Sequence, residues 1–369
     1  MSQTLGPLDY GCTEWRISSQ RAADLYNSGT RLFIKEDLED IEQQLRQSYD
    51  MERFTVRRMD GTIIQISNPM FHVRNPIWYV DILFKSACNL TSLRKPCVKF
   101  QEYWKLVASQ PPGPTETWLC SYIVEWDNKT ARNFRELTDI AQRTQHFDEK
   151  QFLWQNSKTC KQLASFIQDL LGENTMGTIP VKKVLCFGLG DFCRSAPEWL
   201  KRQEADGDKM MENDSMGCMI QHSMALTIAQ LCQGETLLLA QDPDYTKTAE
   251  EILTQKEFKV VGTQGAGAFA EIDDDSIVIS PFPAAPVKQI IADLGRPALI
   301  ITGGVHSNVM NVNKKPYADP ESLRTRQMWL DYDRYSIPNH KDEDEICSAL
   351  GGLQLYRRRQ QPLDSSHHT

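Results

Sequence analysis

The sequence predicts an α/β protein in which a Rossmann-like, five-stranded, mostly parallel sheet follows a helix-rich α+β N-terminal region. The first observation is the stretch KKVLCFGLGDF at residues 182–192, where a short apolar run ends abruptly in glycines and an acid. This pattern is typical of a first parallel strand that enters a ligand-facing turn. The second is that β-branched runs then alternate with helical patterns, which is typical of a parallel sheet covered by helices.

The composition is that of an ordinary globular protein, because 40% of the 369 residues are hydrophobic and 24% are charged. The length predicts more than one lobe. A formal net charge of -8 argues against general binding to nucleic acid or anionic lipid, since both need clustered Lys and Arg. No apolar run approaches the roughly 20 residues of a membrane helix, so we expect a protein that does not enter the membrane.

The ten cysteines are scattered, without a Cys-x-x-Cys pair and without the Cys/His spacing of a zinc site. They predict free thiols and no metal site. Because no apolar signal segment precedes them, the pattern favours a reducing compartment, either the cytoplasm or the nucleus.

The N-terminal region contains one clear amphipathic helix and one clear hairpin. Residues 35–49 place apolar side chains at three- and four-residue spacing, which predicts a helix that packs along one stripe. The stripe consists of Leu38, Ile41 and Leu45. Two alternating runs around Asp60-Gly61 predict a hairpin over residues 53–66 with a tight type I′ turn.

The remainder of this region mixes aromatics with proline. The segment from Trp78 to Trp126 fits either the core of the first lobe, which we favour, or a surface for a protein partner. Helical patterns follow over residues 129–146 and 152–171. Gly, Asn and Pro then cluster between Leu171 and Val181, which predicts a lobe boundary there. The expected division is an N-terminal region at 1–175, a Rossmann-like domain at 181–340 and a flexible tail at 341–369.

Strands and helices alternate in the second domain. The predicted strands are residues 183–188, 235–240, 259–262, 276–280 and 297–302. The predicted helices between and after them are residues 216–232, 246–256, 285–294 and 323–330. Residues 201–215 are predicted to be a solvated loop, and disorder is expected beyond Arg359.

Candidate site residues fall at the ends of three predicted strands. Gly188, Gly190 and Asp191 follow the first strand, Asp242 follows the second, and His306 follows the fifth after two glycines. In an open parallel sheet, ligands bind outside the carboxyl ends of the strands. The glycines would let a ligand approach the backbone, Asp242 is placed to accept hydrogen bonds from a ribose, and His306 is a candidate base or donor. The pairing suggests an adenosine-bearing ligand.

The same residues also fit a purely structural role. The third glycine of the dinucleotide fingerprint is replaced by Cys193, and Asp242 lies 52 residues after Gly190, where about 20 is usual. A structural turn, with Asp242 capping the following helix, is therefore an equal alternative. His222, in a mostly apolar helix, is expected to pack in the core or to be partly exposed and not to be catalytic, and Cys193 is expected to be an inert thiol.

Residues 184–304 resemble the Sensitivity to Red Light Reduced family, the SRR-like domain. The resemblance is carried by VLCFGLGDF, the helix QHSMALTIAQL, and the segments LLLAQDPDYT, SIVISPFP and ALIITGG in the expected order. The helix TRLFIKEDLEDIEQQL is similar to the N-terminal extension of fungal-type members. The family implies an intracellular regulator without settled catalytic chemistry. Members usually show Pro-His-Cys after the fourth strand, whereas this chain has Pro281-Phe282-Pro283, so no role of that His and Cys is carried over to this chain.

Two functions therefore remain open. One is a regulatory or binding protein with a nucleotide-type crevice. The other is an enzyme of the same fold, such as a transferase that uses S-adenosylmethionine held by Gly188, Gly190 and Asp242, with His306 nearby. The sequence favours the first, because the expected site is rich in Phe and Pro and has few acids and bases.

Overall fold

The computed structural model describes residues 13–73, 95–127, 135–137, 139–172, 181–195, 207–232, 234–303 and 319–359. Its centre is a seven-stranded sheet with the order β12-β13-β11-β10-β6-β8-β9. The strands are β6 (Lys183–Phe187), β8 (Leu237–Gln241), β9 (Lys259–Val260), β10 (Ser276–Ser280), β11 (Leu299–Gly303), β12 (Tyr332–Ser336) and β13 (Leu353–Arg358).

The five predicted strands form the parallel part of this sheet. The prediction of five strands in total was wrong, because β13 adds antiparallel to β11, and β12 adds antiparallel to β13. Strand β12 is the edge of the sheet and β13 lies next to it, and their sequences YDRYS and LQLYRR mix polar with apolar residues. That polarity is why the pattern of buried parallel strands does not find them.

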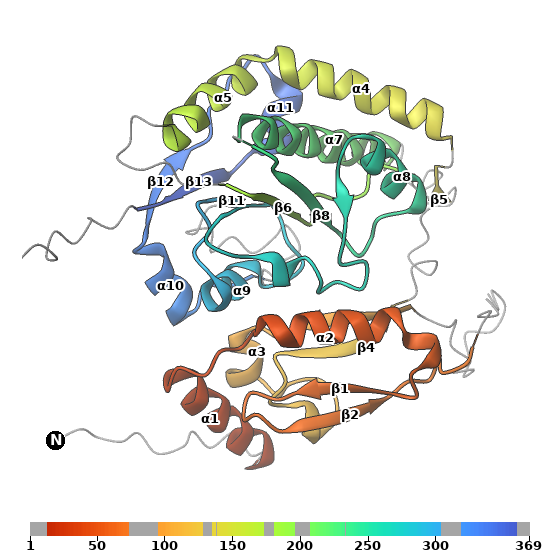
Figure 1. Cartoon of the computed structure of the whole chain (residues 1–369), viewed down its shortest axis with the longest axis vertical. Coiled ribbons are helices and arrows are strands. Elements are labelled where there is room, and N and C mark those ends of the chain that lie inside the picture. Colours follow the sequence, from red (N-terminus) through yellow and green to blue (C-terminus); the bar gives the residue numbers. More distant parts are fainter. Residues whose placement is uncertain are drawn as a thin grey trace, which may run out of the picture.

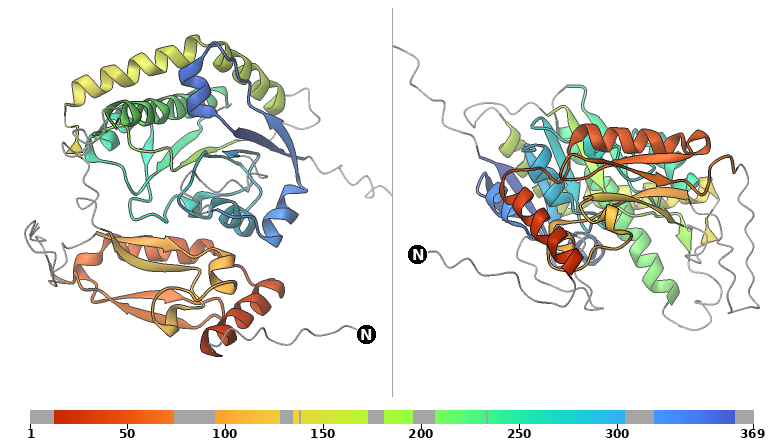
Figure 2. Two further views of the ribbon diagram at one scale, coloured as in Figure 1. Left: turned by 180° about the vertical axis from the view of Figure 1, so that it is seen from behind. Right: turned by 90° about the horizontal axis from the view of Figure 1, so that it is seen from below.

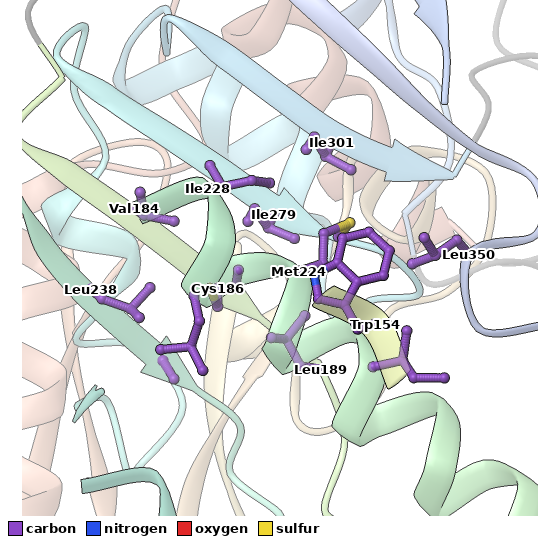
Figure 3. Packing of buried hydrophobic residues seen from close by; sticks show 14 of the residues in the cluster. Trp154, Val184, Cys186, Leu189, Met224, Ile228, Leu238, Ile279, Ile301 and Leu350 are labelled. Carbon is purple, nitrogen blue, oxygen red and sulfur yellow. The ribbon is translucent and has the colours of Figure 1, made fainter. Parts of the chain in front are cut away.

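The two faces of the sheet bury alternate residues of each strand. In β6, Val184 and Cys186 join one hydrophobic cluster, whereas Leu185 and Phe187 join the other. Figure 3 shows the first cluster, in which Trp154 and Met224 pack over the strands. The helices that cover this face are α4 (Ile140–Asn156), α5 (Lys158–Leu171), α7 (Gly207–Leu231), α8 (Lys247–Gln255) and α11 (Asp344–Leu350).

The opposite face carries a thinner layer of α9 (Val287–Leu294), α10 (Leu323–Trp329) and the 3-10 turn η4 (Phe269–Glu271). The N-terminal region lies beneath this layer, as Figures 1 and 2 show from opposite sides. The connection from β9 to β10, residues 261–275, is fully described and contains no α-helix. Helix α2 (Lys35–Arg46) of the N-terminal region packs against η4 in that place.

The N-terminal region is an α+β unit. Besides α2, its helices are α1 (Thr13–Asn27) and α3 (Tyr103–Val107), with 3-10 turns η1 (Ser48–Asp50) and η2 (Thr115–Thr117). Its strands form two antiparallel pairs, β1 (Arg53–Arg57) with β2 (Ile63–Ser67), and β3 (Lys95–Phe100) with β4 (Tyr122–Asp127). A further short pair joins β5 (Arg135–Glu136) to β7 (Arg194–Ser195). Tyr103 and Trp118, from the aromatic-rich segment, are buried in the core.

The predicted hairpin is present, but its turn differs from the prediction. The Arg58 N–H donates to the carbonyl of Thr62 at 2.8 Å, and the Gly61 N–H donates to the carbonyl of Arg58 at 2.9 Å. Of Asp60 and Gly61, only Gly61 has a positive φ, at 83°. A type I′ turn needs two such residues, so this is the longer loop in which one glycine follows an ordinary turn.

Helices α4 and α5 differ from their predicted bounds and pack with the sheet domain. Asp139 caps α4 by accepting the Gln142 N–H, and Ser157 ends α4 and caps α5 by accepting the Cys160 N–H. The apolar faces of α4 and α5 pack on α7, on the far side of the sheet from α2. The break predicted at residues 171–181 therefore separates α5 from β6 within one hydrophobic cluster.

The expected tail contains α11 and β13, which are buried parts of the sheet domain. Ile346, Ala349 and Leu350 of α11 are buried, and Leu355 of β13 pairs with Ile301. The charged run KDEDE at residues 341–345, which leads into α11, is why the sequence pattern did not predict this apolar face. Similarly, α7 begins at Gly207, inside the predicted loop. Residues 360–369, for which disorder is expected, lie outside the described residues.

A buried carboxylate joins the N-terminal region to α9. Asp293 Oδ2 accepts the N–H groups of Leu32 at 2.7 Å and Phe33 at 3.1 Å, and Oδ1 accepts Arg324 Nη1 at 2.8 Å. Arg324 Nη2 in turn donates to the carbonyls of Tyr26 and Thr30, both at 2.6 Å. Burial raises the pKa of Asp293, while Arg324 opposes the rise. Removing Arg324 would leave the buried Asp293 carboxylate without this cationic partner.

We expect Leu355→Ala to lower the free energy of unfolding by about 2–5 kcal/mol, because the Leu355 side chain is fully buried against the sheet. Urea denaturation measures the change. The matched control is Leu330→Ala, since Leu330 is 61% exposed and its truncation should cost under about 0.5 kcal/mol. Equal effects of the two substitutions would contradict the burial of β13.

Candidate functional site

The chain reverses its direction of strand addition between β6 and β10. From β6 it continues to β8 and β9 on one side, and then crosses to β10 and β11 on the other. Ligands of open α/β sheets bind at such a point, beyond the carboxyl ends of the strands. Here the ends of β6 and β10 are tied together, because Ser280 Oγ donates to the carbonyl of Phe187 at 3.3 Å.

Gly188 and the Pro281-Phe282-Pro283 segment meet at this point. Gly188 has a φ of 64°, and a Cβ on it would lie 3.5 Å from Pro283 Cα, so the two loops are in van der Waals contact. Phe282 is 53% exposed beside them. The described residues at the carboxyl ends of β6 and β10 therefore present glycine, proline and an exposed aromatic ring.

Gly190 is required by packing. Its φ is 85°, and an added Cβ would overlap the Sγ of Cys218 on α7. Its N–H donates to Asp242 Oδ2 at 3.1 Å. A side chain at this position would thus be excluded by the protein itself, which fits the structural alternative for this glycine.

Asp191 and Asp242 brace each other's loops. Asp242, after β8, accepts the Gly190 N–H from the loop after β6. Asp191, in that loop after β6, accepts the N–H of Thr246, which is the residue that caps α8. The second oxygens accept local N–H groups, those of Asp244 at 2.9 Å and Cys193 at 2.6 Å. All four carboxylate oxygens therefore hold backbone, which makes the two loops one rigid frame.

Burial raises the pKa of both acids. For Asp242 it raises the pKa to about 6, against the lowering effect of the backbone N–H groups of Asp244 and Gly190. For Asp191 the rise is opposed by the N–H groups of Thr246 and Cys193 and by Arg194. Asp242 therefore changes from the protonated to the ionised form within the mildly acidic pH range.

His222 lies in the core, which is one of the two positions that the sequence predicted for it. It is fully buried, with Nδ1 2.7 Å from the carbonyl of Cys218 and Nε2 2.8 Å from the Tyr245 hydroxyl. Because a carbonyl can only accept, Nδ1 carries the proton, and Nε2 accepts from Tyr245. Burial lowers the pKa of His222 to about 4, which keeps the ring uncharged at neutral pH.

A second frame at the same edge involves Glu42, which the sequence analysis missed. The Glu42 carboxylate, from α2, accepts the N–H groups of Gln264, Ala266 and Gly267 in the loop after β9. The signal was present in the sequence. Position 42 lies four residues after Leu38 and three before Leu45, so an acid stands on the predicted apolar stripe.

The remaining candidates divide as follows. His306 lies outside the described residues. Cys193 is buried, and the eight described cysteines are free thiols. Within the described ranges, no group of three or more His, Cys, Asp or Glu side chains is arranged to hold a metal ion. In the same ranges, no helix combines the length and apolarity needed to cross a bilayer.

We expect Gly190→Ala to be more destabilising than Gly234→Ala by about 1 kcal/mol or more. Both glycines have similar φ values, 85° and 84°, but nothing lies within 4 Å of a Cβ on Gly234. Both changes incur backbone strain, and only the first adds the overlap with Cys218. Urea denaturation of Gly190→Ala with and without Cys218→Ala isolates the overlap; no recovery in the double variant would contradict it.

We also expect Asp242→Asn to flatten the pH dependence of stability. Because burial raises the folded-state pKa to about 6 from 3.8, the folded protein binds this proton more tightly than the unfolded chain. Stability from this group is thus full below about pH 4 and falls as the pH rises to 6. Denaturation at pH 4 to 7 should show that the wild type loses about 2 kcal/mol more than Asp242→Asn. Parallel curves would argue against ionisation of this buried carboxyl.

Comparison with known proteins places these elements in a family. The family model described as SRR1 domain matches residues 160–356, just over half of the chain. The match begins within α5 and ends within β13, so it includes six strands of the central sheet and most of the seventh. No curated protein and no solved structure matches the chain. On the extent of that match, the chain belongs to the SRR1 domain family.

Proposed function

We propose that this SRR1 domain protein is a regulatory or binding protein, and that its ligand-facing surface is the crevice between β6 and β10. The observation that supports this most is the mutual bracing of Asp191 and Asp242, whose four oxygens accept backbone N–H groups. General acid or base catalysis needs a titratable group that can reach a substrate. Carboxylates engaged in this way favour a rigid binding frame over a catalytic pair.

The proposed ligand is a nucleotide-type small molecule, such as S-adenosylmethionine or another adenosine-bearing compound. Phe282 offers an exposed ring for stacking of a base, and Gly188 lies against the same Pro281-Phe282-Pro283 segment. Asp242, with a pKa of about 6, lies after the neighbouring strand, where related folds bind a ribose. We place this function in the cytoplasm or the nucleus, in line with the free cysteines.

In the alternative, the protein is a transferase that binds S-adenosylmethionine through the same residues and also catalyses a group transfer from it. It would require a reactive group near the ligand, for which His306 is the sequence candidate. A third reading makes Phe282 a contact for a protein partner. Measurements of ligand binding distinguish the binding protein, the transferase and the protein-partner contact.

The test is a thermal-shift and calorimetric screen with S-adenosylmethionine, S-adenosylhomocysteine, NAD(P), ATP and heme. A ligand of the folded state raises the melting temperature as its concentration rises. Phe282→Ala should weaken binding of that ligand about tenfold or more, since stacking on an aromatic ring contributes about 1–3 kcal/mol per base. Phe282 is half-exposed, so its removal should leave the melting temperature of the free protein nearly unchanged.

The matched control is Leu237→Ala, which removes another exposed apolar side chain, 55% accessible, at the opposite end of the sheet. Binding should be the same in this variant as in the wild type. Conversion of bound S-adenosylmethionine to S-adenosylhomocysteine would establish the transferase alternative instead. A screen without any concentration-dependent shift would remove the small-molecule reading and leave the protein partner.

A further inference from the structure

The loop at residues 262–268, GTQGAGA, holds a carboxylate as an anion site would. Three backbone N–H groups converge on Glu42: Gln264 at 3.2 Å from Oε1, and Ala266 and Gly267 at 3.0 and 3.1 Å from Oε2. Successive amides that point into one concavity carry positive partial charge and bind anions. The loop lacks the Gly-Lys-Ser/Thr sequence of a phosphate-binding loop, so its sequence alone does not predict an anion site.

The loop is shaped by the sheet and not by the helix that supplies the carboxylate. Gln241, the last residue of β8, donates from Nε2 to the carbonyl of Gly265 at 3.1 Å and accepts the Ala268 N–H at 2.8 Å. The Gly265 N–H donates to the carbonyl of Gly262 at 2.7 Å, and both glycines have positive φ values. These bonds are independent of Glu42, so the concavity should persist when the carboxylate is removed.

The occupant is an internal side chain held in close contact. The Glu42 side chain is 4% exposed, and its cationic neighbour Arg46, at 3.3 Å, is 55% exposed and thus largely screened by solvent. A Cβ on Gly267 would lie 3.0 Å from Glu42 Cγ and 3.2 Å from Gly262 Cα. The buried charge therefore depends mainly on the three N–H groups, and glycine at 267 is what lets it come so close.

We propose that the 262–268 loop is an anion-binding site of this protein, that Glu42 occupies it as an internal ligand, and that carboxylate or phosphate groups are its ligand class. This site is separate from the crevice at Gly188 and Phe282, so its test does not depend on the function proposed above.

Chemical rescue tests the proposal on the full-length chain. The atoms that Glu42→Ala removes correspond to one acetate ion. Acetate supplied in solution should therefore bind to the three N–H groups in place of the Glu42 carboxylate. The melting temperature of Glu42→Ala should rise by about 2 °C or more in acetate relative to chloride at equal pH and ionic strength. A parallel series in phosphate tells whether the site also accepts a tetrahedral anion, or carboxylates alone.

Glu42→Gln is the matched control, because it keeps the shape of the side chain and fills the site without the charge. This variant and the wild type should melt at the same temperature in acetate and chloride. Hydrogen exchange localises the effect, since acetate should slow exchange within residues 262–268 of Glu42→Ala. Should Glu42→Ala fold only in acetate, the rescue is equally established. Acetate no better than chloride, or an equal rise in the wild type, would overturn the proposal.

Discussion

The structure depends on buried carboxylates that accept hydrogen bonds from backbone N–H groups. Glu42 extends from the N-terminal region into the loop after β9, while Asp293 extends from α9 to the N–H groups of Leu32 and Phe33. The two contacts run in opposite directions across the same junction. Each satisfies amides that burial would otherwise leave unpaired, which costs about 1–3 kcal/mol per group. The N-terminal region is thereby a fixed layer under the sheet.

The same principle shapes the carboxyl edge of the sheet. Asp191 and Asp242 exchange hydrogen bonds between the loops after β6 and β8, and Gln241 holds the loop after β9. Backbone that is positioned before a ligand arrives costs little to order on binding. In the function proposed above, such a frame would serve recognition, and the exposed Phe282 would supply apolar surface for a flat ligand. Asp242 also gives the frame a response to pH, because burial moves its pKa to about 6.

Prediction from sequence worked where one segment decides its own structure. The strand at Lys183–Phe187 is apolar at almost every position because both of its faces are buried, and the hairpin around Gly61 follows from local turn chemistry. Prediction failed where the structure of a segment is decided by contact with a segment far along the chain. The strand at Leu353–Arg358 has a polar pattern, and only its pairing with β11 makes it part of the sheet. Glu42 was likewise missed because its loop lies 222 residues away.

By itself, the sequence determined the α/β class, the parallel strands with their order along the chain, and the glycines and acids that would gather at one edge. Short-range periodicity and turn preferences suffice for these features. The tertiary structure decided what those residues do. It packs Gly190 against Cys218 and bonds Asp242 to a neighbouring loop. It also places α2 where the chain between β9 and β10 forms no α-helix. Such roles arise from contacts between distant segments, which no local pattern records.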